Sequence, residues 1–280
     1  MRDKAMNASH PIFLGLIHHE DDRRTQSQRD QARPVAGALR ELGFVALEAE
    51  EYHQVLSDPA TLSSLRIRAL VLKRLWAQEM HHLREIRRRR GSSLTIPFRK
   101  RRKVLERALS VITHRDSLFH AFRRLEIEAA LSLKHLRIWT SVLECDASGA
   151  VVLEDDFYLR DESSPQNLAS LVRTHFQDFE LIDLAGGLSR DSLGLPDAPG
   201  QDLNVPFMVA NTTCAYFISK KACQALVDLV ASNKELLYLA PDFLITELNS
   251  ISFEGSTLLP WDLPLIHGSR DGTVESSIPY

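Results

Sequence analysis

The sequence predicts an α/β fold with a mainly parallel central sheet and an inserted helical hairpin. Short apolar runs alternate with longer segments in which apolar residues recur about every 3.6 positions, the pattern of strands alternating with helices. Residues 84–103 interrupt this alternation with ten basic residues and a single acid. Because 280 residues suffice for one large domain, we expect residues 1–280 to form a single domain with a basic helical insertion at 55–125.

Apart from the insertion, the first half of the chain is predicted to form a strand, a helix, a second strand and a long helix. The apolar run at 11–17 predicts a buried strand, and a helix over about 25–42 ends at Gly43, a natural C-terminal cap. Residues 44–47 predict the second strand. After the insertion, a helix over about 119–143 leads into an apolar run that ends in acids.

The second half continues the alternation. We expect strands at 179–184, 207–210 and 213–218, a helix at 220–233, and a loop rich in Gly, Pro, Ser and Asp at 188–202. Strands that alternate with helices favour a largely parallel sheet, and such sheets bind ligands at the carboxyl ends of their strands. The acidic end of a strand is therefore the predicted location of the site.

Three consecutive carboxylates, Glu154, Asp155 and Asp156, follow the apolar run 150–153. Since side chains alternate across a strand, Glu154 and Asp156 should point to one side and Asp155 to the other. Adjacent carboxylates repel one another, and a fold tolerates them mainly where a cation or hydrogen-bond donors offset the charge. The pattern indicates a divalent metal ion that holds a substrate phosphate, and a solvated acidic turn is the alternative.

Composition is that of an ordinary globular protein, with 44% hydrophobic and 25% charged residues. No apolar run approaches the roughly 18 residues that span a bilayer, and residues 1–7 lack the apolar stretch of a secretory signal. Cys145, Cys214 and Cys223 have no CxxC spacing and are interpreted as small core residues in a reducing compartment, not as zinc ligands. We therefore expect a cytoplasmic protein.

The basic residues of 84–103 flank a flexible break, Gly91-Ser92-Ser93, and the segments on either side have helical periodicity. This predicts a hairpin with a basic tip, whose apolar faces pack on the α/β body or on a second copy in a homodimer. The tip is either solvated or attracted to an anionic surface, such as the inner face of a membrane. Nucleic acid fits less well, because Phe98 is the only aromatic residue in the window.

Four short motifs follow one another in a specific order. They are Glu-x6-His-x3-Trp at Glu128, His135 and Trp139; the strand 151–156 ending in Glu-Asp-Asp; Ala-Tyr-Phe-Ile-Ser-Lys-Lys-Ala at 215–222; and Pro241-Asp242. In this order they resemble glycosyltransferase family 25, which includes bacterial lipooligosaccharide glycosyltransferases and collagen galactosyltransferases. The resemblance covers about residues 11–280, except for about 52–124.

The resemblance implies a GT-A nucleotide-sugar fold and an inverting glycosyltransferase. Such an enzyme would move a hexose from a UDP-sugar to a hydroxyl of a cell-surface or lipid-linked glycan of the lipopolysaccharide type, assisted by Mn²⁺ or Mg²⁺. One departure concerns the donor site. Where the family usually has serine before the motif histidine, this chain has Lys134, whose ammonium could hold a phosphate as a point charge.

A UDP-sugar donor needs groups that neutralise the leaving diphosphate and groups that hold the nucleotide. We assign the metal, acting as a Lewis acid, to Glu154, Asp156 and His267. The residues assigned to the donor itself are Arg23, Arg24, His135, Asp155 and Gly186. The alternatives are a structural role for His267, a hydrogen-bonded core position for His135 and a solvated turn for the two arginines.

An inverting transfer also needs a base that takes the proton of the acceptor hydroxyl. Asp242, which follows Pro241 in an otherwise apolar segment, is the first candidate, and Glu247 is the second. The alternative for Asp242 is the N-cap of the helix that follows it.

Two other functions remain open on the sequence alone. One is a catalytically silent glycosyltransferase-like protein that binds a membrane or a partner through the basic hairpin. The other is an unrelated Mg²⁺-dependent phosphoryl-transfer enzyme that shares only the acidic strand end. The absence of a Walker-type Gly-x4-Gly-Lys loop from the sequence disfavours this last function.

Overall fold

The computed structural model describes residues 10–18, 22–51, 115–186, 199–210, 213–251 and 253–268, together with the isolated positions 69, 72 and 106. Its strands are β1 (His10–Ile17), β2 (Phe44–Glu51), β3 (Gly149–Glu154), β4 (Phe157–Leu159), β5 (Leu181–Asp183), β6 (Leu203–Val205), β7 (Ala215–Ser219), β8 (Thr257–Leu259) and β9 (Leu265–His267). The α-helices are α1 (Asp22–Glu41), α4 (Arg115–Glu144), α5 (Ser164–His175), α6 (Lys220–Ser232) and α7 (Pro241–Glu247). Two 3-10 helices, η3 (Lys234–Tyr238) and η4 (Leu248–Ile251), flank α7.

A seven-stranded sheet in the order β2-β1-β3-β7-β5-β8-β6 forms the centre of the fold, and β4 pairs with β9 in a separate ribbon. Strand β1 runs parallel to β2 and β3, and β5 runs parallel to β8, whereas β7 is antiparallel to β3 and β5, and β6 to β8. The α/β class is confirmed. The sheet is mixed, with five strands in one direction and two opposed, so the start of β7 lies beside the end of β3.

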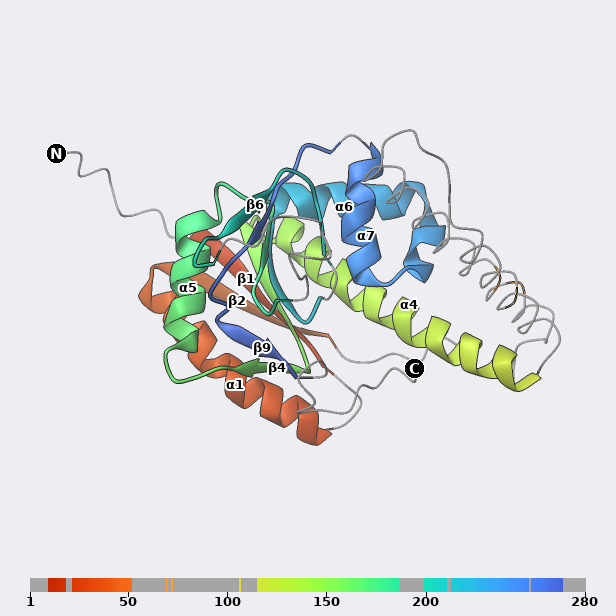
Figure 1. Cartoon of the computed structure of the whole chain (residues 1–280), viewed down its shortest axis with the longest axis horizontal. Coiled ribbons are helices and arrows are strands. Elements are labelled where there is room, and N and C mark those ends of the chain that lie inside the picture. Colours follow the sequence, from red (N-terminus) through yellow and green to blue (C-terminus); the bar gives the residue numbers. More distant parts are fainter. Residues whose placement is uncertain are drawn as a thin grey trace.

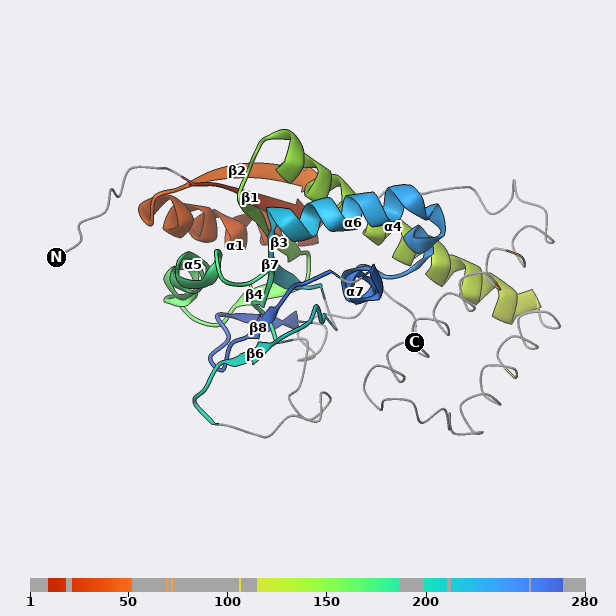
Figure 2. The same cartoon turned by 90° about the horizontal axis from the view of Figure 1, so that it is seen from above.

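Helices cover both faces of the sheet. Figure 1 shows α1 and α5 side by side on one flank and α4, α6 and α7 on the other, and Figure 2 shows this layering from above. The alternation of side chains along β3 explains it. Val151 and Leu153 pack in one core cluster with α1 and α5, while Ala150 and Val152 pack in another with α4 and α6. A side chain at the end of β3 therefore turns to one layer or the other according to its position in this alternation.

The strand predicted at 207–210 is wrong, since the nearest strand is β6, a few residues earlier. Side chains, and not a neighbouring strand, bond the backbone of this apolar segment. The Met208 N–H donates to Asn249 Oδ1 at 2.9 Å, and the Val209 N–H donates to Thr257 Oγ1 at 3.1 Å. An apolar run indicates burial, but it does not show whether side chains or a neighbouring strand form the hydrogen bonds of the buried backbone groups.

The other predicted strands and helices are present with shifted ends. The helix predicted from about 119 begins at Arg115, and the strand predicted at 179–184 is limited to β5. Most of the predicted insertion at 55–125, including the basic segment 84–103, lies outside the described residues, as does most of the predicted loop at 188–202. In the part of the chain that the structure describes, no helix is long and apolar enough to cross a membrane.

Gly149 lies where β3 approaches β7 too closely for a side chain. A Cβ at this position would contact the backbone oxygen of Ile218 and would lie 2.8 Å from the ring of Phe217. We expect Gly149→Ala to lower the free energy of unfolding by about 1–3 kcal/mol, the usual cost of overpacking. A Cβ on Gly37, inside α1, would meet no atom within 4 Å, so Gly37→Ala should raise this free energy by about 0.5–1 kcal/mol. Urea denaturation measures both, and a neutral Gly149→Ala would contradict the packing between the strands.

Candidate functional site

Two neighbouring acids at the end of β3 turn to opposite layers of the fold. Glu154 turns toward α4, where its Oε1 lies 3.0 Å from Nε2 of His135. Asp155 turns toward α1, where its carboxylate forms an ion pair with Arg24. The alternation predicted for these two side chains is confirmed.

The ion pair between Arg24 and Asp155 is largely withdrawn from solvent, with side-chain exposures of 21% and 16%. Burial raises the pKa of Asp155 to about 7, although the positive charge of Arg24 opposes this rise. The neighbouring carboxylates of Asp156 and Glu154 raise the pKa further. Asp155 therefore exchanges its proton close to neutral pH.

A buried chain of hydrogen bonds fixes Glu154 from the α4 side. Nε1–H of Trp139 donates to the Tyr216 hydroxyl at 3.1 Å, and that hydroxyl lies 2.7 Å from Nδ1 of His135. Because the ionised carboxylate of Glu154 can only accept, the proton of the neutral His135 ring is assigned to Nε2, which donates to Glu154. Nδ1 then accepts from the Tyr216 hydroxyl. His135 is fully buried and bonded at both ring nitrogens. This is the hydrogen-bonded core position that the sequence left open as the alternative to a donor contact, and from it His135 orients Glu154.

This arrangement keeps Glu154 ionised. Burial alone would raise the pKa of Glu154, but hydrogen bonds from His135 and Thr213 and the proximity of His267 hold it below the usual value. Glu154 is thus a fixed negative charge in the carboxylate cluster, which consists of Glu154, Asp155 and Asp156.

Asp156 belongs to a second group at the same edge, with Cys214 and His267. The ligand atoms of these three side chains all lie within 4.8 Å of one another, and His267 Nδ1 is 3.6 Å from Asp156 Oδ2. The β4–β9 ribbon brings His267 there, because it pairs His267 with Phe157, the residue after Asp156. The group could hold a metal ion. Two of the three predicted metal ligands, Asp156 and His267, belong to this group. Its third member is Cys214 and not the predicted Glu154.

Asp242, on α7, is a further acidic residue that the charge of Glu154 affects. Burial raises its pKa to about 7 against the opposing hydrogen bond from the Phe243 N–H, and the charges of Glu128 and Glu154 contribute to the rise. Asp242 is not the N-cap of α7, because Ala240 occupies that position and Asp242 lies in the first turn. A carboxyl group with a pKa near 7 beside the site is suited to take up a proton.

The structure also describes the remaining predicted residues. Glu247 is buried at the other end of α7, where Ser250 Oγ donates to its Oε2 at 3.2 Å. Arg23 is exposed on α1. Gly186 follows β5 with φ +74°, and its N–H donates to Asp183 Oδ1 at 2.8 Å.

Lys134, the departure from the family pattern, is buried on α4. Its ammonium donates to the backbone oxygen of His18, just after β1, at 2.7 Å. Lys134 therefore ties α4 to the carboxyl end of β1, next to the acidic end of β3.

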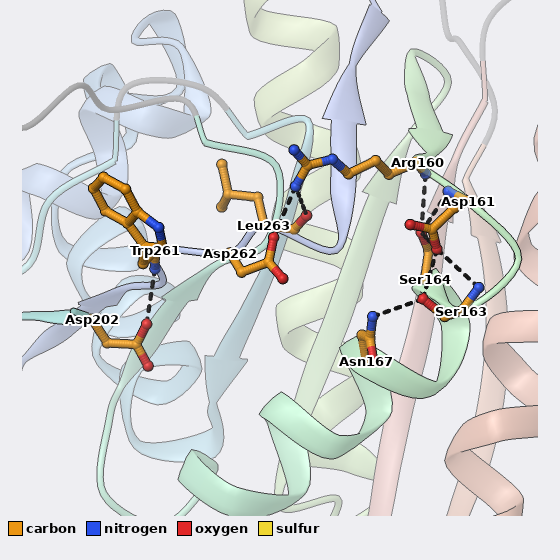
Figure 3. Close-up of polar contacts among 9 residues, drawn as sticks. All are labelled: Arg160, Asp161, Ser163, Ser164, Asn167, Asp202, Trp261, Asp262 and Leu263. Carbon is orange, nitrogen blue, oxygen red and sulfur yellow. Dashed lines mark hydrogen bonds and ion pairs between the residues drawn. The ribbon is translucent and has the colours of Figure 1, made fainter. Parts of the chain in front are cut away.

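A polar cleft of about 180 Å³ lies at the far end of the β4–β9 ribbon (Figure 3). Arg160 donates to Asp262 Oδ1 at 2.8 Å and to the Leu263 carbonyl at 3.4 Å, which connects the two loops that border the cleft. Asn167 and Ser164 of α5 also line it. Figure 3 shows Trp261 beside Asp262; the backbone N–H of Trp261 donates to Asp202 Oδ1, and this tryptophan is 44% exposed.

The comparisons with known proteins add no relative. No family model matches the chain, and no curated protein matches it. The resemblance to glycosyltransferase family 25 therefore rests on the four short motifs and their order.

Sequence reasoning missed Cys214, Thr213 and Tyr216. It assigned all three cysteines to the core, which holds for buried Cys223 but not for exposed Cys145, while buried Cys214 belongs to the metal-capable group. The sequence did contain a sign that Cys214 lies at the end of a strand, because it immediately precedes β7. However, only the antiparallel pairing of β7 with β3 places the start of β7 beside the acids, and the sequence predicted a parallel sheet.

The Tyr216 hydroxyl is the centre of the buried hydrogen-bond chain. Tyr216→Phe would leave Trp139 Nε1 without this acceptor and His135 Nδ1 without this donor, so we expect the free energy of unfolding to fall by about 1–3 kcal/mol. Tyr158→Phe, at a partly exposed position in β4, is the matched control and should change it by less than about 0.5 kcal/mol. Equal effects of the two variants in chemical denaturation would show that the chain does not contribute to stability.

Proposed function

We propose that the protein is an inverting, metal-assisted glycosyltransferase of the GT-A type that moves a hexose from a UDP-sugar to a glycan hydroxyl. One observation carries the proposal: the negative charge of Glu154, at the acidic end of β3, acts on Asp242 of α7, whose pKa burial raises to about 7. The reaction needs negative charge that can hold a cation, and a base near neutrality for the acceptor proton. Both requirements are met by these residues, and the four motifs favour the same reaction.

The leaving group of the donor is a diphosphate on which negative charge builds as the sugar–oxygen bond breaks. Asp156, Cys214 and His267 offer oxygen, sulfur and nitrogen ligands from three separate segments, which fits a divalent cation. A cation bound there would supply the positive charge that offsets the developing charge on the diphosphate.

The sugar and ribose of the donor would lie on the α1 side of the acids. The carboxyl of Asp155 is partly protonated at neutral pH, so it can accept or donate a hydrogen bond to a hydroxyl. Arg24 holds this carboxyl in place through the ion pair. Loss of Arg24 would therefore affect donor binding through Asp155 even without a contact to the donor.

Asp242 would take the proton of the attacking acceptor hydroxyl. A base works best when its pKa is near the operating pH, since it is then ionised yet still basic. The ionised carboxylate of Glu154 helps to produce this state, because its charge raises the proton affinity of Asp242. His135 and Tyr216 contribute by keeping Glu154 oriented and ionised.

UDP release from a panel of UDP-sugars, without added metal and with Mn²⁺, Mg²⁺, Co²⁺ or Zn²⁺ in turn, tests the proposal. We expect release from at least one donor that depends on the metal and increases when a glycan acceptor is present. If UDP binds but no donor turns over, the catalytically silent alternative is favoured. Metal-dependent hydrolysis of simple phosphate esters would favour phosphoryl transfer instead.

The same assay tests the base. Turnover should fall as the pH drops below about 7, because protonated Asp242 cannot accept a proton. Asp242→Asn should lower kcat by about 10²–10⁴-fold and change the donor KM little. Glu247→Gln is the matched comparison on the same helix, and a larger loss of kcat in that variant would move the base to the second candidate.

Stability provides the control for Asp242→Asn. The folded-state pKa is raised from 3.8 to about 7, so the folded protein binds the proton more tightly and loses stability as the pH rises through this window. Asparagine stays neutral, so the variant should melt above the wild type at pH 8, and by a smaller margin at pH 5. A variant that melts earlier and turns over normally per folded molecule would instead indicate a structural role.

For the acceptor, we infer that its sugar hydroxyls bind in the polar cleft beside Arg160 and Asp262. Three residue steps separate Pro264, which lines this cleft, from His267, about 10 Å at the usual strand rise. The lining side chains offer hydrogen-bond donors and acceptors. Trp261 does not line the cleft, but it directly precedes the lining residue Asp262, is 44% exposed and could offer an aromatic face to the same sugar. A lipid-linked glycan, or the precursor of a cell-surface glycan, would present such hydroxyls to a cytoplasmic enzyme. When the acceptor is lipid-borne, the enzyme would contact the membrane through residues 84–103.

Arg160→Ala and Trp261→Ala should each raise the acceptor KM by about tenfold, equivalent to roughly 1.4 kcal/mol. The rate of UDP release without acceptor should not change, since the cleft lies away from the carboxylate cluster. Arg33→Ala, which removes an exposed arginine of α1, is the matched control. If both cleft variants have the wild-type acceptor KM, the acceptor binds elsewhere.

A further inference from the structure

Cys214 is the unexpected member of the group at the edge of the sheet. Its thiol is buried between the ends of β3 and β7, where the Glu154 N–H donates to the Cys214 carbonyl at 2.8 Å. The thiol donates a hydrogen bond to Asp156. A metal ion bound here would take the place of the thiol proton, because the thiolate is the form that binds metals.

One pair of the group already has the spacing of ligands on a small tetrahedral ion. Two ligands bound to Zn²⁺ at the usual distances are separated by about 3.3–3.7 Å. His267 Nδ1 and Asp156 Oδ2 are 3.6 Å apart, and the three ligand atoms lie within 4.8 Å of one another. Closure of the group around an ion would shorten its longest separation by no more than about 1 Å.

Each ligand is held by a separate part of the fold. Asp156 follows β3, and its backbone oxygen accepts from the Gly268 N–H at 2.7 Å, which fixes it to the residue after His267. Cys214 is fixed by the register of β7 against β3, and His267 by the register of β9 against β4. The three positions are therefore set by strand pairing, and not by one flexible loop.

We propose that Asp156, Cys214 and His267 form a three-ligand site in which the Cys214 thiolate selects borderline metals, Zn²⁺ and Co²⁺, over the hard ions Mn²⁺ and Mg²⁺. Thiolate sulfur and imidazole nitrogen bind Zn²⁺ and Co²⁺ well, whereas Mg²⁺ prefers an all-oxygen, octahedral environment. Three protein ligands leave a fourth position open, as in catalytic zinc sites, and a diphosphate oxygen could occupy it.

The proposal deepens the proposed glycosyl transfer by naming the metal of the same site. It differs from the sequence assignment in two respects, the ligand and the ion. Metal binding can nevertheless be measured without any sugar donor, so the two proposals can fail separately.

Titration of the wild-type protein with Co²⁺ is the direct test. A Co²⁺ ion bound to thiolate in a tetrahedral site gives a near-ultraviolet sulfur-to-metal charge-transfer band and intense visible bands. We expect one equivalent of Co²⁺ to produce both, and Zn²⁺ to abolish them by competition, while excess Mg²⁺ leaves them unchanged. If saturating Co²⁺ gives no charge-transfer band, the proposal is overturned, and this result does not depend on any variant folding.

Cys214→Ser should remove the charge-transfer band and weaken Zn²⁺ binding by more than about 100-fold, the upper end of what loss of an outer-shell partner costs. Cys145→Ser is the matched control, because Cys145 is an exposed thiol, and its band should match the wild type. His267→Gln, at a partly exposed position, gives a second test and should lose the tetrahedral visible bands. If the band survives in Cys214→Ser and disappears in Cys145→Ser, the ligand is Cys145 and the proposed site is wrong.

Metal-dependent UDP release separates the two proposals. If the Co²⁺ bands appear but no UDP-sugar turns over, the metal site stands and the glycosyl transfer fails. If turnover requires Mg²⁺ or Mn²⁺ and is unchanged in Cys214→Ser, the transfer stands and the thiolate site is wrong.

Discussion

The burial of three consecutive carboxylates at the end of one strand is the constraint on which the rest of this structure depends. Two carboxylates about 4 Å apart repel by roughly 4 kcal/mol at an effective dielectric constant of 20, so a largely buried cluster needs nearby compensation. The fold supplies it from different directions: Arg24 faces Asp155, and His135 faces Glu154. The alternation of side chains along β3 makes this division possible, because adjacent acids turn to helices on opposite faces of the sheet.

The repulsion between the carboxylates is only partly offset, and the remaining repulsion shifts the pKa values of these residues. Glu154 keeps a lowered pKa, while Asp155 and Asp242 have values raised to about 7. One carboxylate is thus held ionised at the expense of its neighbours. Separation of pKa values within a cluster is characteristic of sites that move protons, although structural charge networks also produce it.

The sequence predicted the local features of this site and missed those set by long-range pairing. The apolar run before Glu154, the period-two alternation and the helix that carries His135 are local patterns, and each was located correctly. The positions of Cys214 and Tyr216 depend on the antiparallel insertion of β7 between β3 and β5, which no local pattern encodes. The false strand at 207–210 has a related origin, because periodicity reports burial and not the identity of the hydrogen-bond partner.

Coupling within the cluster determines how any single substitution should be interpreted. The charge of Glu154 acts on both Asp155 and Asp242, so a change at Glu154 alters the proton affinity of both carboxyl groups. Neutralising Glu154 would lower the pKa of Asp242 and leave a weaker base that is ionised over a wider pH range. Neutralising Asp242 would relieve Glu154 of a neighbouring charge without disturbing its bond to His135. The two substitutions are therefore not equivalent, although both remove one negative charge, and only the second isolates the proton acceptor from the residue that tunes it.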